Sequence, residues 1–250
     1  MQEISITAED RLSVASLSDV GCVRSNNEDS LGVFPSENPH KGVLLVVADG
    51  MGGAAAGEVA SRLAVEAVAK TYFHGTTGSP GSALQSSLVA ANEAIHEHAE
   101  ANPEFQGMGT TCTAVAVIGR EFWFAHVGDS RAYLAVGGDL VQVTQDHSLA
   151  AEFERQGGGA PAQARNMLTR CLGVRPVVEV DCSVSAQPLP NGGTLVLCSD
   201  GLTNLVQDGE ILQFVTMHRP DAACRRLIQL ARERGAPDNV SVAIGRHARD

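Results

Sequence analysis

The sequence has few positive charges. Its 250 residues contain 18 Lys and Arg against 29 Asp and Glu, which gives a formal net charge of −11. This balance argues against a general affinity for nucleic acid or for an anionic membrane surface, because both depend on clustered cations. An acidic, soluble surface accounts for most of the negative charge. Carboxylates gathered in a metal site would add only a few.

Paired cysteines and long apolar runs are also missing. The six cysteines are scattered without a Cys-x-x-Cys pair and mostly lie in apolar stretches, which predicts reduced core residues rather than disulfides or zinc ligands. No apolar run approaches the roughly 20 residues that span a bilayer. The first residues lack the basic and apolar regions of a signal peptide. We therefore expect a cytoplasmic protein.

No linker, low-complexity tract or short repeat divides the chain, so we expect one domain over 1–250 with a core at about 13–244. Strand blocks, each followed by a helix pair, indicate an α+β order rather than an alternating one. The patterns predict strands at 12–17, 30–34, 42–48, 110–118, 122–127, 132–136, 140–143, 177–184, 194–198 and 240–244. They predict helices at 54–73, 82–101, 148–156, 208–217 and 222–233.

The clearest local pattern is the apolar run 43–48, which ends in Asp49 and a glycine-rich turn. Asp-Gly after a strand is often a hairpin turn. Here, however, apolar residues at helical spacing follow in 54–73, and no second strand does. The order of strand, acidic-Gly loop and helix predicts a carboxylate at the lip of a buried strand, where the backbone can approach a ligand closely.

Other acids share this context. Asp200 also follows an apolar strand and precedes glycine, while Asp129 and Asp238 lie in Gly- or Pro-rich loops beside strands. Each acid alone is more often a turn residue. If these strand ends meet, carboxylates so close together must take up protons or share a cation. An all-oxygen set favours Mg²⁺ or Mn²⁺ over zinc.

Arg24 precedes Glu28 and Asp29 in a loop rich in turn residues. Its planar guanidinium suits phosphate oxygens, although an arginine in such a loop is, by itself, more often a solvated surface residue. Two ions bridged by one carboxylate could hold an activated water for in-line attack on a phosphoryl group. The residues together suggest metal-assisted phosphate chemistry.

Six short segments carry these acids, in the order GCVRSNNED (21–29), ADGMGG (48–53), GTT (109–111), VGDSR (127–131), CSDGL (198–202) and PDN (237–239). In this order and at this spacing they resemble the motifs of the bacterial type 2C (PPM) metal-dependent serine/threonine protein phosphatases. Each segment alone is weak evidence, but six in family order are specific. The resemblance extends over nearly the whole chain.

The resemblance implies a four-layer α/β/β/α sandwich of two antiparallel sheets flanked by helix pairs. It implies hydrolysis of phosphoserine and phosphothreonine in proteins by direct attack of a metal-bridged water, without a phosphoenzyme. The implied cofactors are two Mn²⁺ or Mg²⁺ ions and a third, weaker one. Phosphorylated proteins would be the partners, with a bacterial Ser/Thr kinase opposing the enzyme. We expect a monomer.

The resemblance also assigns roles to single positions. Asp49 would bridge two ions, the Gly50 carbonyl would bind one of them, and Asp200 and Asp238 would bind the other.

Four further positions match outer parts of the same site. Asp129, with Asp200, would hold the third ion, and Arg24 would bind the substrate phosphate. Glu28 and Asp29 match residues that bind metal directly or through water, and we expect the indirect role.

The chain departs from the family pattern in three places. Met51 and Ala54 stand where many relatives have histidines, which leaves no obvious general acid. Metal-bound water and His147 are the candidates, although His147 fits a structural loop role better. The segment 146–168 matches the family's flap, is a few residues short and contains three consecutive glycines. Such a flap is expected to be mobile and to become ordered when substrate binds.

Two other functions stay open. A catalytically silent regulatory module that binds phosphoproteins or another partner would be signalled by lost metal ligands, and none is lost. Hydrolysis of small phosphoesters would use the same site and differ only in substrate.

Overall fold

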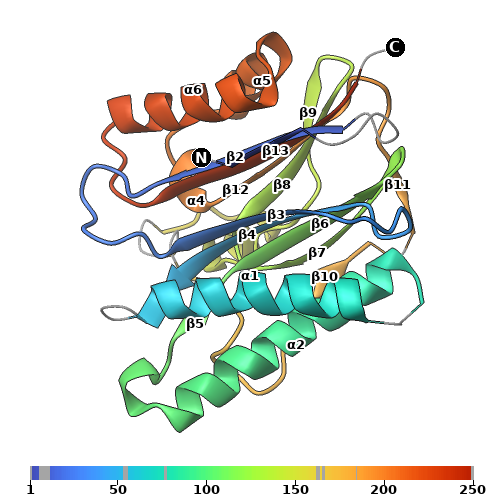
Figure 1. Cartoon of the computed structure of the whole chain (residues 1–250). Coiled ribbons are helices and arrows are strands. Elements are labelled where there is room, and N and C mark those ends of the chain that lie inside the picture. Colours follow the sequence, from blue (N-terminus) through green and yellow to red (C-terminus); the bar gives the residue numbers. More distant parts are fainter. Residues whose placement is uncertain are drawn as a thin grey trace.

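The strands form two antiparallel sheets that stack face to face in the computed structural model of the chain (Figure 1). The structure describes residues 2–5, 12–52, 56–75, 78–161, 164, 167–183 and 185–248. Ala54 and part of the flap segment lie outside these residues. One sheet has the order β1-β2-β13-β12-β8-β9. The other has the order β10-β7-β6-β4-β3, with β5 beside β4 and β11 beside β7.

The strands of the first sheet come from both ends of the chain and from its middle. They are β1 (Gln2–Ser5), β2 (Leu12–Asp19), β8 (Arg131–Val136), β9 (Asp139–Gln142), β12 (Thr194–Cys198) and β13 (Val240–His247). The strands of the second sheet are β3 (Asp29–Pro35), β4 (Val43–Met51), β5 (Gly109–Thr110), β6 (Cys112–Ile118), β7 (Glu121–Val127), β10 (Asp181–Cys182) and β11 (Gln187–Pro188).

A helix pair covers the outer face of each sheet (Figure 1). The helices α1 (Ala56–His74) and α2 (Pro80–Ala101) pack on the second sheet, while α5 (Asp208–Met217) and α6 (Pro220–Glu233) pack on the first. Shorter elements are a 3₁₀ turn (Pro103–Phe105), α3 (Leu149–Arg155) and α4 (Asp200–Thr203). The four-layer sandwich expected from the resemblance is confirmed.

Three apolar clusters fill the spaces between the layers. One joins α1 and α2 to the second sheet and includes Leu44, Tyr72 and Leu88. Another joins α5 and α6 to the first sheet, and a third lies between the two sheets. Alternation along the strands explains this division, because successive side chains of a strand point to opposite faces. Leu44 and Leu45, adjacent on β4, thus belong to different clusters.

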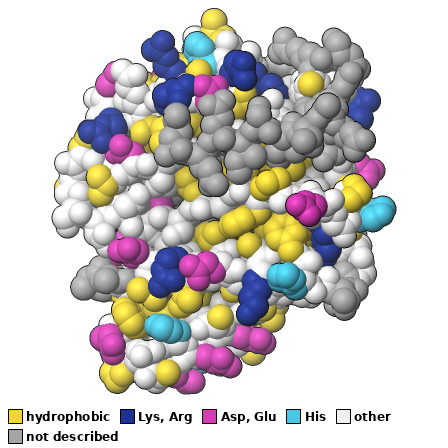
Figure 2. Space-filling view, in the orientation of Figure 1, with side chains coloured by type: hydrophobic (Ala, Val, Ile, Leu, Met, Phe, Trp, Pro, Cys, Tyr) yellow, Lys and Arg dark blue, Asp and Glu magenta, His cyan; other side chains and the backbone are white. Residues whose placement is uncertain are grey.

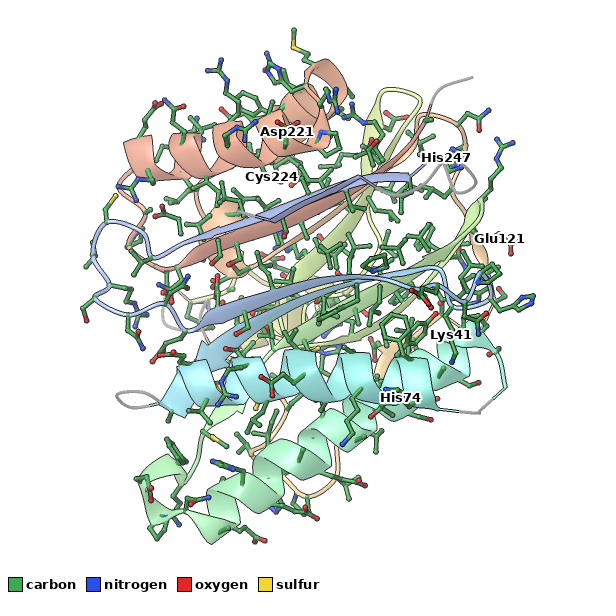
Figure 3. All side chains as sticks on the ribbon, viewed as in Figure 1. Lys41, His74, Glu121, Asp221, Cys224 and His247 are labelled. Atoms are coloured by element: carbon green, nitrogen blue, oxygen red, sulfur yellow. The ribbon has the colours of Figure 1, made fainter. Side chains whose placement is uncertain are left out.

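Helix ends follow local sequence signals. Ser79 accepts a hydrogen bond from the Ser82 amide at the start of α2, as expected of an N-cap residue. The C-terminal end of α1 is bound by a residue from outside the helix. Lys41 Nζ donates to the carbonyl oxygens of Tyr72 and Gly75 at 2.7 and 3.2 Å. A cation at a helix C-terminus is favourable. Lys41 and His74 lie at the same end of α1 in Figure 3.

The cysteines are free, as the sequence predicts, but they are not all core residues. Cys112, Cys198 and Cys224 are buried, and Cys224 lies between α6 and the sheet (Figure 3). Cys22, in contrast, is exposed.

The expected strand at 177–184 is wrong for most of its length. Of its described residues, only Asp181–Cys182 form a strand, paired with β7, and the preceding residues form a loop along α2. The backbone just before the segment is held against α2, because Asn92 donates to the carbonyl oxygens of Arg175 and Pro176. The short helix α4 was also not predicted from the sequence.

Acidic and basic side chains are interspersed on the face drawn in Figure 2, so the coloured residues there form no large patch of one sign. Among the described residues, no helix combines the length and apolar character that a membrane crossing requires.

Candidate active site

Four loops from the two sheets meet around one cavity of about 470 Å³. Asp49 lies two residues before the end of β4, and Asp129 lies in the turn from β7 to β8. Asp200 begins α4 after β12, and Asp238 precedes β13. All four aspartates line the cavity. The second sheet supplies Asp49, the first supplies Asp200 and Asp238, and Asp129 lies where the chain crosses between them.

Hydrogen bonds from two neighbouring threonines fix the end of β4. The Asp49 amide donates to Thr111 Oγ1 at 2.9 Å, while the Asp49 carbonyl accepts from the Thr110 hydroxyl at 2.8 Å and the Thr111 amide at 2.9 Å. Thr111 Oγ1 also exchanges a 2.7 Å bond with Ser130 Oγ. The backbone that carries Asp49 is therefore tied to the loop that carries Asp129.

Glycine is required where these loops touch. A Cβ at Gly50 would lie 2.0 Å from the Gly57 carbonyl oxygen and 2.6 Å from that of Glu28. A Cβ at Gly201 would lie 2.0 Å from the Asn239 carbonyl oxygen. All three distances are far inside van der Waals contact. The glycines thus permit the close packing that brings the acidic loops together.

Asn239 anchors the loop that carries Arg24 and Glu28. Its Nδ2 donates to the carbonyl oxygens of Val20 and Asn26, each at 2.9 Å, and its Oδ1 accepts from the Glu28 amide at 2.8 Å. Its side chain is only 5% exposed. The sequence motif included Asn239, but its role was not assigned.

The carboxylates raise one another's pKa. Burial is the main cause of the raised pKa of Asp49, followed by the charges of Asp29, Asp200 and Asp129. Burial and the charge of Asp238 likewise raise the pKa of Asp200. Burial raises the pKa of Glu28 on the cavity rim. Such a cluster is costly unless protons or cations neutralise it.

Asp29 on β3 is the register partner of Asp49 on the neighbouring strand β4. It is 8% exposed, and burial raises its pKa to about 7 despite a 2.8 Å bond from Ser199 to its Oδ2. Its Oδ1 is buried without a hydrogen-bond partner among the described residues. Burial and the charge of Asp200 also raise the pKa of Asp129 to about 7.

This donor set fits a hard divalent cation. The cavity offers carboxylate and backbone oxygens, with no histidine among its lining residues, and such oxygens are the ligands that Mg²⁺ and Mn²⁺ prefer. In the described part of the chain, no three side chains of His, Cys, Asp or Glu lie close enough together to hold one ion. Asp238 instead accepts a 2.9 Å bond from Arg24 Nη2. A cation at Asp238 would thus compete with Arg24 for this carboxylate.

His147 has a structural position. The Gly128 amide donates to its Nδ1 at 3.1 Å, which places the ring proton on Nε2, 3.0 Å from Asp181 Oδ2. Asp181 Oδ1 in turn accepts from Arg170 at 2.7 Å. The ring is 2% exposed, and burial lowers its pKa. Since both ring nitrogens are engaged, His147 holds the Asp129 turn and is not free to serve the cavity.

The structure brings the expected site residues together. Those that line the cavity are Arg24, Glu28, Asp49, Gly50, Asp129, Asp200 and Asp238, while Asp29 is buried behind them. Met51 also lines the cavity. An apolar wall of Leu168, Cys171 and Val174 was not predicted. No signal in the sequence marks it, because these residues lie far along the chain from the acidic motifs.

Known proteins match both the sequence and this geometry. The protein phosphatase 2C family matches residues 23–237. The serine/threonine protein phosphatase PstP of Mycobacterium tuberculosis is 39% identical over 235 residues, which cover 93% of this chain and 44% of PstP. The serine/threonine phosphatase stp of Listeria innocua is 37% identical over 236 residues, which cover 90% of this chain and 92% of stp.

Among solved structures, the catalytic domain of PstP in complex with two manganese ions superimposes with a TM-score of 0.82 at 36% identity, covering 95% of this chain and 98% of that one. The chain spans less than half the length of full PstP. Because the family match extends over most of the sequence and the fold agrees, this chain belongs to the protein phosphatase 2C family.

Proposed function

We propose that this chain hydrolyses phosphoserine and phosphothreonine esters in proteins and requires divalent cations to do so. The observation that carries the proposal is the convergence of four aspartates from both sheets on one cavity, with Arg24 on its rim. Acids raised in pKa by burial and by each other are neutralised either by protons or by cations, and divalent cations would stabilise their charged form. A relative of known structure holds two manganese ions in the same fold.

In this proposal Asp49 would help to hold both of two Mn²⁺ or Mg²⁺ ions. The Gly50 carbonyl would help to hold one ion, and Asp200 and Asp238 would help to hold the other. When bound, the ions supply an activated water and draw electron density from the phosphoryl oxygens.

Three neighbouring acids have outer roles. Asp129 helps to hold a third ion with Asp200. Glu28 and Asp29 hold water or neighbouring groups rather than an ion. The raised pKa of Asp29 and its unpartnered Oδ1 are consistent with a group that responds to a nearby cation.

The chain's own residues orient the substrate. Arg24, whose side chain is 52% exposed at the rim, turns from Asp238 to the phosphate and fixes it by charge-assisted bonds. The wall of Leu168, Cys171 and Val174 excludes water from one side of the cavity. None of the described lining residues is a histidine, and in this proposal water in the site gives the proton to the leaving serine or threonine oxygen.

The substrates and partners of the whole protein are part of this proposal, since the chain spans 44% of PstP. Phosphorylated proteins, including targets of an opposing Ser/Thr kinase, are the substrate class that the family relationship favours. None of the described residues that line the cavity restricts it to a small phosphoester.

Turnover of a phosphothreonine peptide with Mn²⁺ tests the function. EDTA and Asp49→Asn are each expected to reduce kcat at least 100-fold, and Mn²⁺ should reverse the effect of EDTA. Asp139→Asn, at an exposed β-turn, is the matched control and should keep wild-type activity. Phosphopeptide binding without turnover would instead favour the silent regulatory module. A kcat/KM that is higher for p-nitrophenyl phosphate than for all phosphopeptides would favour small phosphoesters.

A further inference from the structure

A second cavity adjoins the acidic one. It has a volume of about 530 Å³ and shares Leu168, Cys171 and Val174 with the acidic cavity. Its remaining lining includes Val177 and Val178. The two cavities are therefore adjacent, and a chain whose phosphorylated side chain enters the acidic cavity can reach the second cavity across these three side chains.

Apolar side chains are exposed around this second cavity. Seven large hydrophobic side chains are exposed among the described residues, and three of them lie between 167 and 177. They are Met167 at 53%, Val174 at 44% and Val177 at 81% exposure. Single exposed hydrophobics are ordinary, but a concentration of them beside a ligand cavity marks a binding surface.

The backbone under these side chains is firmly held. Asn92, 1% exposed on α2, accepts from the Gly173 amide at 2.8 Å and donates to the Arg175 and Pro176 carbonyl oxygens. Leu172 exchanges two backbone hydrogen bonds with Thr110, of 2.8 and 3.1 Å. The loop is thus fixed along α2 (Figure 1) while its valines face solvent. A rigid apolar surface loses little conformational entropy when it binds.

The charges of the second cavity are balanced. Arg170 and Arg175 line it together with Glu152 and Glu179. Arg170 Nη1 lies 2.7 Å from Asp181 Oδ1, and Arg170 Nε lies 3.9 Å from Glu179 Oε2. The positive charge of Arg170 is therefore largely neutralised. The lining therefore has no net sign to select an acidic or a basic residue, and its valines are the distinguishing feature.

Building on the function proposed above, we propose that the second cavity is a specificity pocket for an apolar side chain of the phosphoprotein substrate. Cavities of this size that share a wall have centres roughly 10 Å apart, which an extended chain covers in about three residues. The apolar side chain thus lies about three residues from the phosphorylated serine or threonine.

Matched phosphothreonine peptides test this pocket. Each peptide carries Leu, Ser or Asp at one position from two to four residues before or after the phosphothreonine, in an otherwise Gly-Ser-Ala background. We expect Leu at one of these positions to give a kcat/KM at least fivefold higher than Ser or Asp at the same position. Each kcat/KM is divided by the value for p-nitrophenyl phosphate. In Val177→Lys this preference should fall below twofold.

Val141→Lys is the control, because Val141 is a similarly exposed valine, at 52%, on β9 and outside both cavities. It should keep the wild-type preference for Leu. Melting temperatures of both variants establish that each is folded.

Binding separates this inference from the proposed function. Fluorescence polarisation with labelled peptides that carry a non-hydrolysable phosphonate in place of phosphothreonine measures the same Leu preference without turnover. Tighter binding of the Leu peptide, lost in Val177→Lys, supports the pocket even if no peptide is hydrolysed. Turnover with no Leu preference at any position, a preference for Asp, or a preference unchanged in Val177→Lys would overturn the pocket and leave the phosphatase function standing.

Discussion

Arg24 Nη2 donates a 2.9 Å hydrogen bond to Asp238 Oδ2, so a side chain expected to bind phosphate is paired with one expected to bind a cation. The two side chains are 52% and 42% exposed. An exposed pair of this kind contributes only about 0–1 kcal/mol. A divalent ion or a phosphate therefore displaces it readily.

Replacing Arg24 with Ala should weaken the affinity for a phosphopeptide and strengthen the affinity for Mn²⁺. Loss of charge-assisted bonds to phosphate, about 1.5–3 kcal/mol, should lower kcat/KM for a phosphopeptide about 10- to 100-fold, mainly through KM. Mn²⁺ affinity should rise up to about fivefold, because Asp238 no longer has a competing partner. Steady-state kinetics and isothermal titration calorimetry measure the two effects. Arg62→Ala, at an exposed i,i+4 pair with Glu66, is the control. Weaker Mn²⁺ binding in Arg24→Ala would contradict the competition.

The stability of the metal-free protein should fall as pH rises. Burial raises the pKa of Asp29 and Asp129 to about 7 from an ordinary 3.8. At pH values between 3.8 and about 7, the folded form therefore holds protons that the unfolded chain has already released. Stability from these protons is complete below pH about 4 and is lost as pH passes 7. Each group contributes a slope of up to about 1.4 kcal/mol per pH unit.

Melting temperatures from pH 5 to pH 8 in EDTA check this slope. Mn²⁺ should remove most of the decrease, because it binds the deprotonated carboxylates. Asp129→Asn should flatten the EDTA curve by removing one of the two groups. An EDTA melting temperature that rises over this range would show that the acids are not buried as described.

His147 should matter for folding and not for proton transfer. Removing its ring in His147→Ala deprives the Gly128 amide and Asp181 Oδ2 of their His147 partner and leaves a cavity, which should lower the free energy of unfolding by about 2–4 kcal/mol. His147→Gln can replace both bonds and should lose less. Urea denaturation measures both variants. At saturating Mn²⁺, kcat for His147→Gln should keep the shape of the wild-type pH profile. Loss of its alkaline limb would assign the general acid to His147.

Gly50 should tolerate no side chain. A Cβ there would lie 2.0 Å from the Gly57 carbonyl oxygen, so Gly50→Ala should lower the free energy of unfolding by about 3 kcal/mol or more and reduce kcat. Gly209→Ala is the matched control, since a Cβ at this exposed position in α5 meets no atom within 4 Å. It should raise stability by about 0–1 kcal/mol. Urea midpoints compare the two, and similar midpoints would contradict the close packing at β4.

The parts of the fold that the sequence predicts well are the long periodic ones. The helix expected at 208–217 has those bounds in the structure, and the helix expected at 82–101 begins two residues earlier, at Pro80. The acidic strand ends were also recognisable, because an apolar run followed by Asp-Gly is a local pattern. Their assembly in one cavity agrees with the resemblance, while their roles as ligands stay predictions.

Features that depend on distant contacts were not predictable. The valines of 177–180 resemble a strand. Asn92, more than 80 residues away in the sequence, bonds instead to the backbone just before them, at Gly173 and Arg175, and this backbone follows α2. The engaged ring of His147 depends on Gly128 and Asp181 in the same way. The sequence contains these residues but not their proximity.

The position of β13 constrains when the site can exist. This last strand lies in the interior of its sheet, between β2 and β12, and Asp238 precedes it by two residues. During synthesis, strands β3 to β7 emerge early and can pair among themselves. The first sheet lacks its interior strand β13 until Val240–His247 have been synthesised. Such long-range pairing is slow, and a nascent chain that lacks β13 has nothing to hold Asp238 at the cavity.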